Sequence, residues 1–110
     1  MAETNCIFNA TVEQLIQLKD MRYKELESKY FEILSCEREL KDIENTLYLE
    51  TNFKELGLTN EKMRNAYVQD QTLEHRFKLD MAKYELKQQE HALIILNDLI
   101  QLRLQEVKKE

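Results

Sequence analysis

The feature of this 110-residue sequence that most limits its fold is the near absence of glycine and proline. Gly57 is the single glycine, and there is no proline. These two residues are the main signals for turns, so a chain almost without them has few turns and long elements. Charged residues make up 34% of the sequence, accompanied by many leucines and glutamines. Because this composition is typical of coiled coils and long helices, we expect one all-α domain over residues 1–110.

The residues around Gly57 predict a tight connection between two helices. Glycine accepts the left-handed conformation that closes a helix at its C-terminus. Two residues later, Thr59 can cap a new helix through its hydroxyl, and Asn60 opens that helix. Glu61 then lies in the first turn, where its charge meets the positive end of the helix dipole.

We therefore predict two long helices, at about residues 10–56 and 60–107, preceded by an N-terminal arm of residues 1–9. The start of the first helix is open between Asn9 and Thr11, either of which could cap it. Helices of this type are only marginally stable alone, so they need a shared apolar seam. We expect an antiparallel coiled-coil hairpin.

Apolar residues recur at steps of three and four, as helices require. In the first helix they are Leu26, Tyr30, Ile33, Cys36, Leu40, Ile43 and Leu47. The second helix has two such stripes, one of Met63, Tyr67, Phe77, Met81 and Tyr84, the other of Leu79, Ala82, Leu86, Leu93, Leu96, Ile100 and Val107. With the turn near position 58, residue i should face roughly residue 116 − i. The expected neighbours are Leu47 with Val68, Leu40 with Phe77, Ile33 with Ala82, and Leu15 with Ile100.

The open end of the hairpin carries more apolar residues than one partner helix can cover, since they surround most of the second helix. A helix that is apolar on all sides is buried on more than one side. We expect either the N-terminal arm or a second copy of the chain to cover the excess, and favour a homodimer in a four-helix arrangement. The expected interface residues are Ile7, Phe8, Leu15, Ile16, Leu93, Ile95, Leu96, Leu99, Ile100 and Leu102.

Catalysis is not expected, because a two-helix hairpin has no concave pocket in which reacting groups converge. His75 and His91 are 16 positions apart on one predicted helix, about 24 Å, so they cannot share a metal ion. We expect His91 near the seam and His75 on a solvated flank. Cys36 falls in the apolar stripe and Cys6 in the arm, and both are expected to be reduced thiols. The sequence predicts no metal and no cofactor.

A basic cluster after the turn, with Lys62, Arg64, Arg76 and Lys78, leaves a nucleic-acid contact conceivable. No aromatic platform accompanies it, and the net charge of −5 disfavours binding to phosphates. No apolar run of about 18 residues is present, so no membrane span is expected. The N-terminus has no positively charged region ahead of an apolar one, so no signal peptide is expected.

The segment Leu56-Gly57-Leu58-Thr59-Asn60-Glu61-Lys62-Met63-Arg64-Asn65-Ala66 resembles a turn found in many small helical-hairpin proteins of phages and prophages. In them a long helix ends in a glycine, followed by Thr-Asn-Glu, two variable residues, Arg and a small residue. The resemblance implies an early accessory product acting in the cytoplasm of a bacterial host cell. A structural explanation of the same residues is helix capping, with Arg64 reaching back to the carbonyls that end the first helix.

Three functional hypotheses follow. The first is a noncatalytic interaction protein, such as an inhibitor that binds a host or bacterial defence protein, for example a nuclease or another immunity effector. The second is a nucleic-acid-binding accessory in phage recombination or replication. The third is a structural component of the virion.

Overall fold

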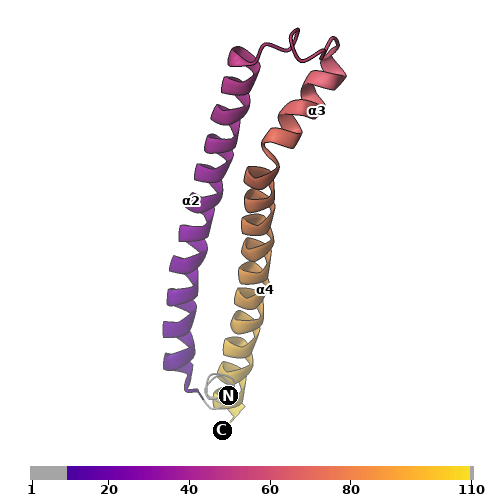
Figure 1. Cartoon of the computed structure of the whole chain (residues 1–110). Helices are drawn as coiled ribbons and strands as arrows, with labels where there is room; N and C mark the ends of the chain where they lie inside the picture. Colours follow the sequence, from indigo (N-terminus) through magenta and orange to yellow (C-terminus); the bar gives the residue numbers. More distant parts are fainter. Residues whose placement is uncertain (1–9, 110) are drawn as a thin grey trace. The chain divides into compact units, whose positions relative to one another are not determined.

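The computed structural model describes the backbone of residues 10–109 and the side chains of residues 10–106. Three helices account for most of this part: α2 (Val12–Glu50), α3 (Glu61–Gln71) and α4 (Leu73–Lys109) (Figure 1). No strand occurs among the described residues, which confirms the expected all-α class. The chain divides into two compact units, unit 1 with residues 1–30 and 85–110, and unit 2 with residues 31–84.

Helix α2 begins with a reciprocal pair of hydrogen bonds, the capping box. The Gln14 amide N–H donates to Thr11 Oγ1 at 3.2 Å, and the Thr11 amide N–H donates to Gln14 Oε1 at 3.0 Å. Both bonds satisfy amide groups that the first turn of a helix leaves without partners. Thr11 is therefore the cap, and Asn9, the other candidate, lies outside the described residues.

Helix α2 ends at Glu50, so the prediction that it continues to residue 56 was wrong. The cause is Asn52, whose Oδ1 accepts a hydrogen bond of 3.3 Å from the Glu55 amide. Asparagine in this role starts a new helical turn instead of continuing the old one. The chain consequently leaves α2 and forms one separate turn before Gly57.

Gly57 closes that separate turn in the left-handed conformation, with φ of 75°. Its amide donates to the Lys54 carbonyl at 3.2 Å, and the Leu58 amide donates to the Phe53 carbonyl at 2.9 Å. This pair of bonds is the Schellman motif. The predicted conformation of Gly57 is confirmed, although the segment that it closes is one turn and not the long helix.

Helix α3 is capped by Asn60 and not, as predicted, by Thr59. Asn60 Oδ1 accepts a bond of 2.9 Å from the Met63 amide, and Glu61 lies in the first turn as expected. Arg64 Nε donates to the Asn60 carbonyl at 3.3 Å. Nε of Arg64 thus bonds at the start of its own helix and not, as expected, to the carbonyls that end the first helix.

The predicted helix 60–107 is interrupted at Thr72, between α3 and α4 (Figure 1). The Thr72 side chain is buried. Its Oγ1 donates to the Val68 carbonyl at 2.8 Å and accepts from Arg76 Nε at 3.0 Å. A threonine hydroxyl bonded to the carbonyl four residues earlier competes with the backbone pattern and bends helices. The local chemistry of Thr72 accounts for a break that contains neither glycine nor proline.

The buried residues of each unit come from the predicted seam. In unit 1, Leu15 packs with Leu96 and Ile100, as the expected pairing of Leu15 with Ile100 requires. In unit 2 the buried hydrophobic residues are Ile33, Cys36, Leu40, Val68, Leu79 and Ala82. Most members of two predicted stripes are thus confirmed as core residues: Leu26, Ile33, Cys36 and Leu40 of the first helix, and Leu79, Ala82, Leu93, Leu96 and Ile100 of the second. Tyr30 was predicted in the same stripe but is 45% exposed, so its predicted place in the seam was wrong.

The other predicted stripe does not lie in the seam. Phe77 is 65% exposed, Tyr84 59% and Met81 42%. The expected pairing of Leu40 with Phe77 is wrong for the same reason. Helical periodicity identifies both stripes of α4, but only the face with Leu79 and Ala82 can turn towards α2.

Cross-helix contacts inside each unit show antiparallel packing. In unit 1 the Lys29 ammonium lies 2.6 Å from the Glu85 carboxylate, and the Tyr30 hydroxyl donates to Glu90 at 2.8 Å. In unit 2 the contacts are Glu37 with Lys83, Glu39 with His75, and Glu44 with Arg76. The residue numbers in these five pairs add up to 114 or 120, on either side of the predicted 116.

Candidate interaction surface

The described side chains include more exposed than buried large hydrophobic residues. Eighteen large hydrophobic residues are exposed, against eleven hydrophobic residues in the cores. A pair of helices covers one stripe of each helix, so apolar residues elsewhere on the circumference stay in contact with solvent. Scattered exposed residues are ordinary, and contiguous ones mark interaction surfaces. The question is therefore which of the eighteen lie together.

The clearest contiguous set lies on the first turns of α4. We call Leu73, Phe77, Met81 and Tyr84 the outer stripe; all four are exposed. Their spacing of four, four and three places them on one side of a helix. Because Leu79 and Ala82 occupy the side that faces α2, the outer stripe points elsewhere.

A smaller apolar set lies on α2 in the same unit. Phe31 and Leu34 are three positions apart, and they are 64% and 55% exposed. The buried side of α2 in this unit carries Ile33, Cys36 and Leu40. We call Phe31 and Leu34 the α2 patch.

The residues expected to form an oligomer interface at the open end divide into three groups. Leu15, Leu93, Leu96 and Ile100 are buried within unit 1, and Leu99 is partly buried against that core. Ile16, Ile95 and Leu102 are exposed. Ile7 and Phe8 lie outside the described residues. The four buried residues pack inside the chain, so they are not surface that a second copy could contact.

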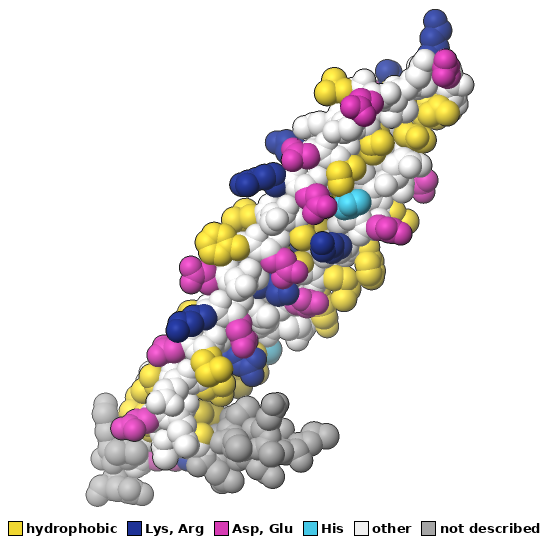
Figure 2. Space-filling model, turned by 60° about the vertical axis from the view of Figure 1, so that its left-hand side comes forward, with side chains coloured by type: hydrophobic (Ala, Val, Ile, Leu, Met, Phe, Trp, Pro, Cys, Tyr) yellow, Lys and Arg dark blue, Asp and Glu magenta, His cyan; other side chains and the backbone are white. Residues whose placement is uncertain are grey.

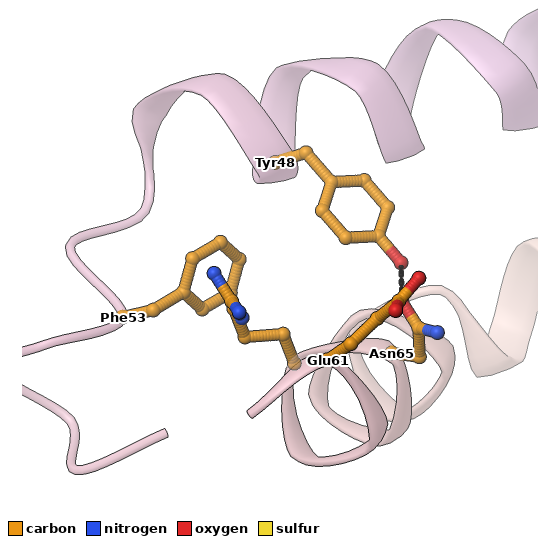
Figure 3. A pocket seen from close by; sticks show the side chains of 5 residues that line it. Tyr48, Phe53, Glu61 and Asn65 are labelled. Carbon is orange, nitrogen blue, oxygen red and sulfur yellow. Dashed lines mark hydrogen bonds between the residues drawn. The ribbon is translucent and has the colours of Figure 1, made fainter. Parts of the chain in front are cut away.

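The turn region of unit 2 forms a shallow hollow of about 570 Å³ (Figure 3). Tyr48 comes from α2, Phe53 from the connection, and Glu61, Arg64 and Asn65 from α3. Figure 3 shows the Tyr48 hydroxyl bonded to the Asn65 side chain, where the hydroxyl donates to Oδ1. This bond links the end of α2 to the start of α3.

An aromatic cluster supports the same turn. The Phe53 ring lies 6.1 Å from that of Tyr67, in an edge-to-face arrangement, and 6.1 Å from that of Tyr48. Such pairs stabilise beyond the area that they bury. Gly57, Asn60 and Phe53 thus have structural roles here, while Thr59 is exposed. Phe53 and Asn52 were not predicted to have these roles. For Asn52 the spacing Asn-x-x-Glu to Glu55 was an available signal.

The structure does not bring the four candidate nucleic-acid residues together. Arg76 donates to Thr72 and pairs with Glu44, and Arg64 donates to its own turn. Lys62 on α3 and Lys78 on α4 are exposed. Figure 2 shows acidic and basic side chains interspersed with hydrophobic ones over the face it displays. The described residues show no continuous basic field of the kind that tracks a phosphate backbone.

The two histidines do not form a site. His75 Nε2 lies 3.8 Å from Glu39 Oε1, and His75 Nδ1 is buried with no hydrogen-bond partner among the described residues. His91 is exposed, so its predicted position near the seam was wrong. In residues 10–109 no three His, Cys, Asp or Glu side chains are grouped so that they could hold a metal ion.

Cys36 is a buried free thiol, which confirms its place in the apolar core. Cys6 lies outside the described residues. Within the described part of the chain, no helix combines the length and apolarity that a membrane span requires.

Comparisons with protein-family models, with curated proteins and with solved structures gave no significant match. The surface of the chain itself is therefore the basis for inferring its function.

Proposed function

We propose that this chain is a noncatalytic interaction protein that binds another protein through its exposed apolar residues. The observation that carries the proposal is the excess of exposed over buried large hydrophobic residues in the described part of the chain. Removing such residues from water is the main favourable term in protein association. A partner would gain this term at the α2 patch or at the outer stripe.

The α2 patch is large enough to matter in a complex. Burial of a Phe or Leu side chain contributes about 1.5–3 kcal/mol relative to exposure. Because Phe31 and Leu34 are each more than half exposed, their burial under a partner would contribute roughly 2–4 kcal/mol together. That is the range in which a few central residues dominate an interface.

The narrower form of the proposal is an inhibitor of a host or bacterial defence protein, acting in the cytoplasm of a bacterial cell. Its support is the resemblance of residues 56–66 to the turn of small phage proteins. A protein is a better partner than nucleic acid for this chain, because its net charge is −5 and Arg76 is already paired with Glu44.

Affinity purification from bacterial lysate tests the proposal when wild type is compared with a double variant, Phe31→Glu with Leu34→Glu. We expect wild type to retain a protein in stoichiometric amount and the double variant to lose it. Lys24→Glu is the matched control, because it changes the net charge by the same two units at an exposed position of α2. Far-UV circular dichroism must show equal helicity in all three.

Two results would contradict the proposal. One is the absence of any protein enriched above an unrelated tagged control. The other is equal loss of the bound protein in the Lys24→Glu control, because that would show a charge effect and not an apolar contact.

A further inference from the structure

Helix α4 carries a second, outward seam with the spacing of a coiled coil. Phe77, Met81, Tyr84 and Gln88 follow one another at steps of four, three and four, and all four are exposed. This is the spacing of the two core positions in a heptad repeat. The helical periodicity of α4 places these four residues on one side of that helix.

We propose that a second copy of the chain is the partner of this seam, and that the two α4 helices pack antiparallel. Residue i of one copy then faces roughly residue 165 − i of the other. Met81 of each copy lies against Tyr84 of the other, which gives two equal apolar layers about a twofold axis. This inference goes beyond the proposed function, because it requires no foreign protein.

The charges beside the seam favour this register. The charged residues flank this core in two rows, and the partner numbers in these rows add up to 163 and 167, on either side of 165. Lys78 therefore lies opposite Glu85 of the second copy, and Asp80 opposite Lys87. Each pair joins opposite charges, and because of the twofold symmetry each pair occurs twice in the dimer. These four residues are exposed.

Competing arrangements unite like charges. A shift of one heptad lowers each of these sums by seven, which sets Lys78 against Lys78 and Asp80 against Asp80 of the second copy. A parallel pair sets Asp80 against Glu85. Both alternatives are disfavoured by like-charge repulsion, so the pattern selects one orientation and one register.

Asp80 and Lys87 belong to a row of residues seven positions apart, which also contains Leu73 and Ile94. The two outer residues of this row are complementary as well. Leu73, exposed at one end of this row, faces Ile94 of the second copy at the other. Ile94 is likewise exposed. An interface made of the same surface on both copies must be complementary to itself. This row meets that requirement, because Leu73 lies against Ile94 and Asp80 lies against Lys87. Since only one stripe of each helix is buried, we expect a weak dimer, on the order of micromolar.

Exchange of two charged residues in the 110-residue chain tests the proposal. Asp80 and Lys87 are the better pair to exchange, because Glu85 also contacts Lys29 of its own copy. Sedimentation equilibrium over about 1–100 μM measures the dissociation constant. Wild type should dimerise, and Asp80→Lys and Lys87→Asp should each weaken the dimer by about fivefold to tenfold, since each creates two repulsive pairs.

The double variant Asp80→Lys with Lys87→Asp should recover the wild-type constant, because it restores both pairs with reversed signs. Asp20→Lys on α2 is the control with the same change of charge, and it should alter the constant less than about twofold. A wild-type monomer throughout the concentration range would overturn the proposal. Equal dissociation constants for wild type and the single variants would also overturn it. So would a double variant whose dimer is no tighter than the dimers of the single variants. None of these results bears on capture of a foreign protein, so the two proposals can fail separately.

Discussion

The helix break at Thr72 contains a buried side-chain hydroxyl whose removal should have a measurable cost in stability. Replacement of Thr72 by Val keeps the shape of the side chain and removes its hydroxyl. That hydroxyl donates to the Val68 carbonyl and accepts from Arg76 Nε in a buried position. We expect Thr72→Val to lower the free energy of unfolding.

The magnitude follows from what each lost bond leaves behind. A neutral hydrogen bond contributes about 0.5–1.5 kcal/mol net, and one with a charged group more. The Val68 carbonyl keeps a partner, because it also accepts from the Thr72 amide at 3.1 Å. The Arg76 side chain is 36% exposed, so water can replace the lost acceptor. The two bonds together should therefore contribute about 1–2 kcal/mol.

Urea denaturation followed by far-UV circular dichroism measures this difference, and Thr46→Val is the matched control. Thr46 Oγ1 donates to the Asp42 carbonyl at 2.9 Å, which is the same bond to the fourth preceding residue, but in an exposed position. Both groups there can return to water, so the control should change the free energy of unfolding by less than about 0.5 kcal/mol. If Thr72→Val costs no more than Thr46→Val, burial does not strengthen the Thr72 bonds and our account of the break is wrong.

Three further predictions concern the turn, the core and pH. Gly57→Ala should cost about 1 kcal/mol in a thermal or urea scan from its positive φ alone, because an added Cβ meets no atom within 4 Å. Leu96→Ala should cost about 2–5 kcal/mol and its exposed neighbour Ile95→Ala less than about 0.5 kcal/mol, and equal effects would contradict the assigned core. The hydrogen bond to Glu90, with smaller effects of desolvation and of the Glu90 charge, raises the pKa of Tyr30 above its ordinary value. Stability from this bond is therefore present below about pH 10 and is lost as pH rises through the folded pKa, and Tyr30→Phe should remove that part of the loss in unfolding measured between about pH 9 and 11.

The elements that local chemistry specifies strongly could be predicted from the sequence. Gly57 is in the left-handed conformation because only glycine adopts it without strain, and Thr11 caps a helix because Gln14 can return the bond. The antiparallel register was predictable from the position of the turn alone. Leu15 and Ile100 accordingly meet in one core.

Two features could not be predicted, for different physical reasons. Thr72 interrupts a helix where its buried hydroxyl bonds to both the Val68 carbonyl and Arg76 Nε. Thr46 also bonds to the fourth preceding carbonyl, but at an exposed position, and causes no break. The sequence does not state which of the two will be buried. Phe77 has the periodicity of a core residue, but periodicity alone does not decide which of two apolar stripes faces the neighbouring helix.

The compact turn of unit 2 has a consequence for the speed and order of folding. The bond between Tyr48 and Asn65 spans 17 positions, whereas the pair of Glu44 and Arg76 spans 32. Each doubling of a loop adds about 0.6 kcal/mol to the entropic cost of closing it, so contacts should form outward from the turn. We expect Asn60→Ala to slow folding and leave unfolding nearly unchanged in stopped-flow experiments; faster unfolding alone would place the turn after the rate-limiting step. The cross-helix contacts of unit 2 that lie farthest from Gly57 close the longest loops, so they should be the last of that unit to form.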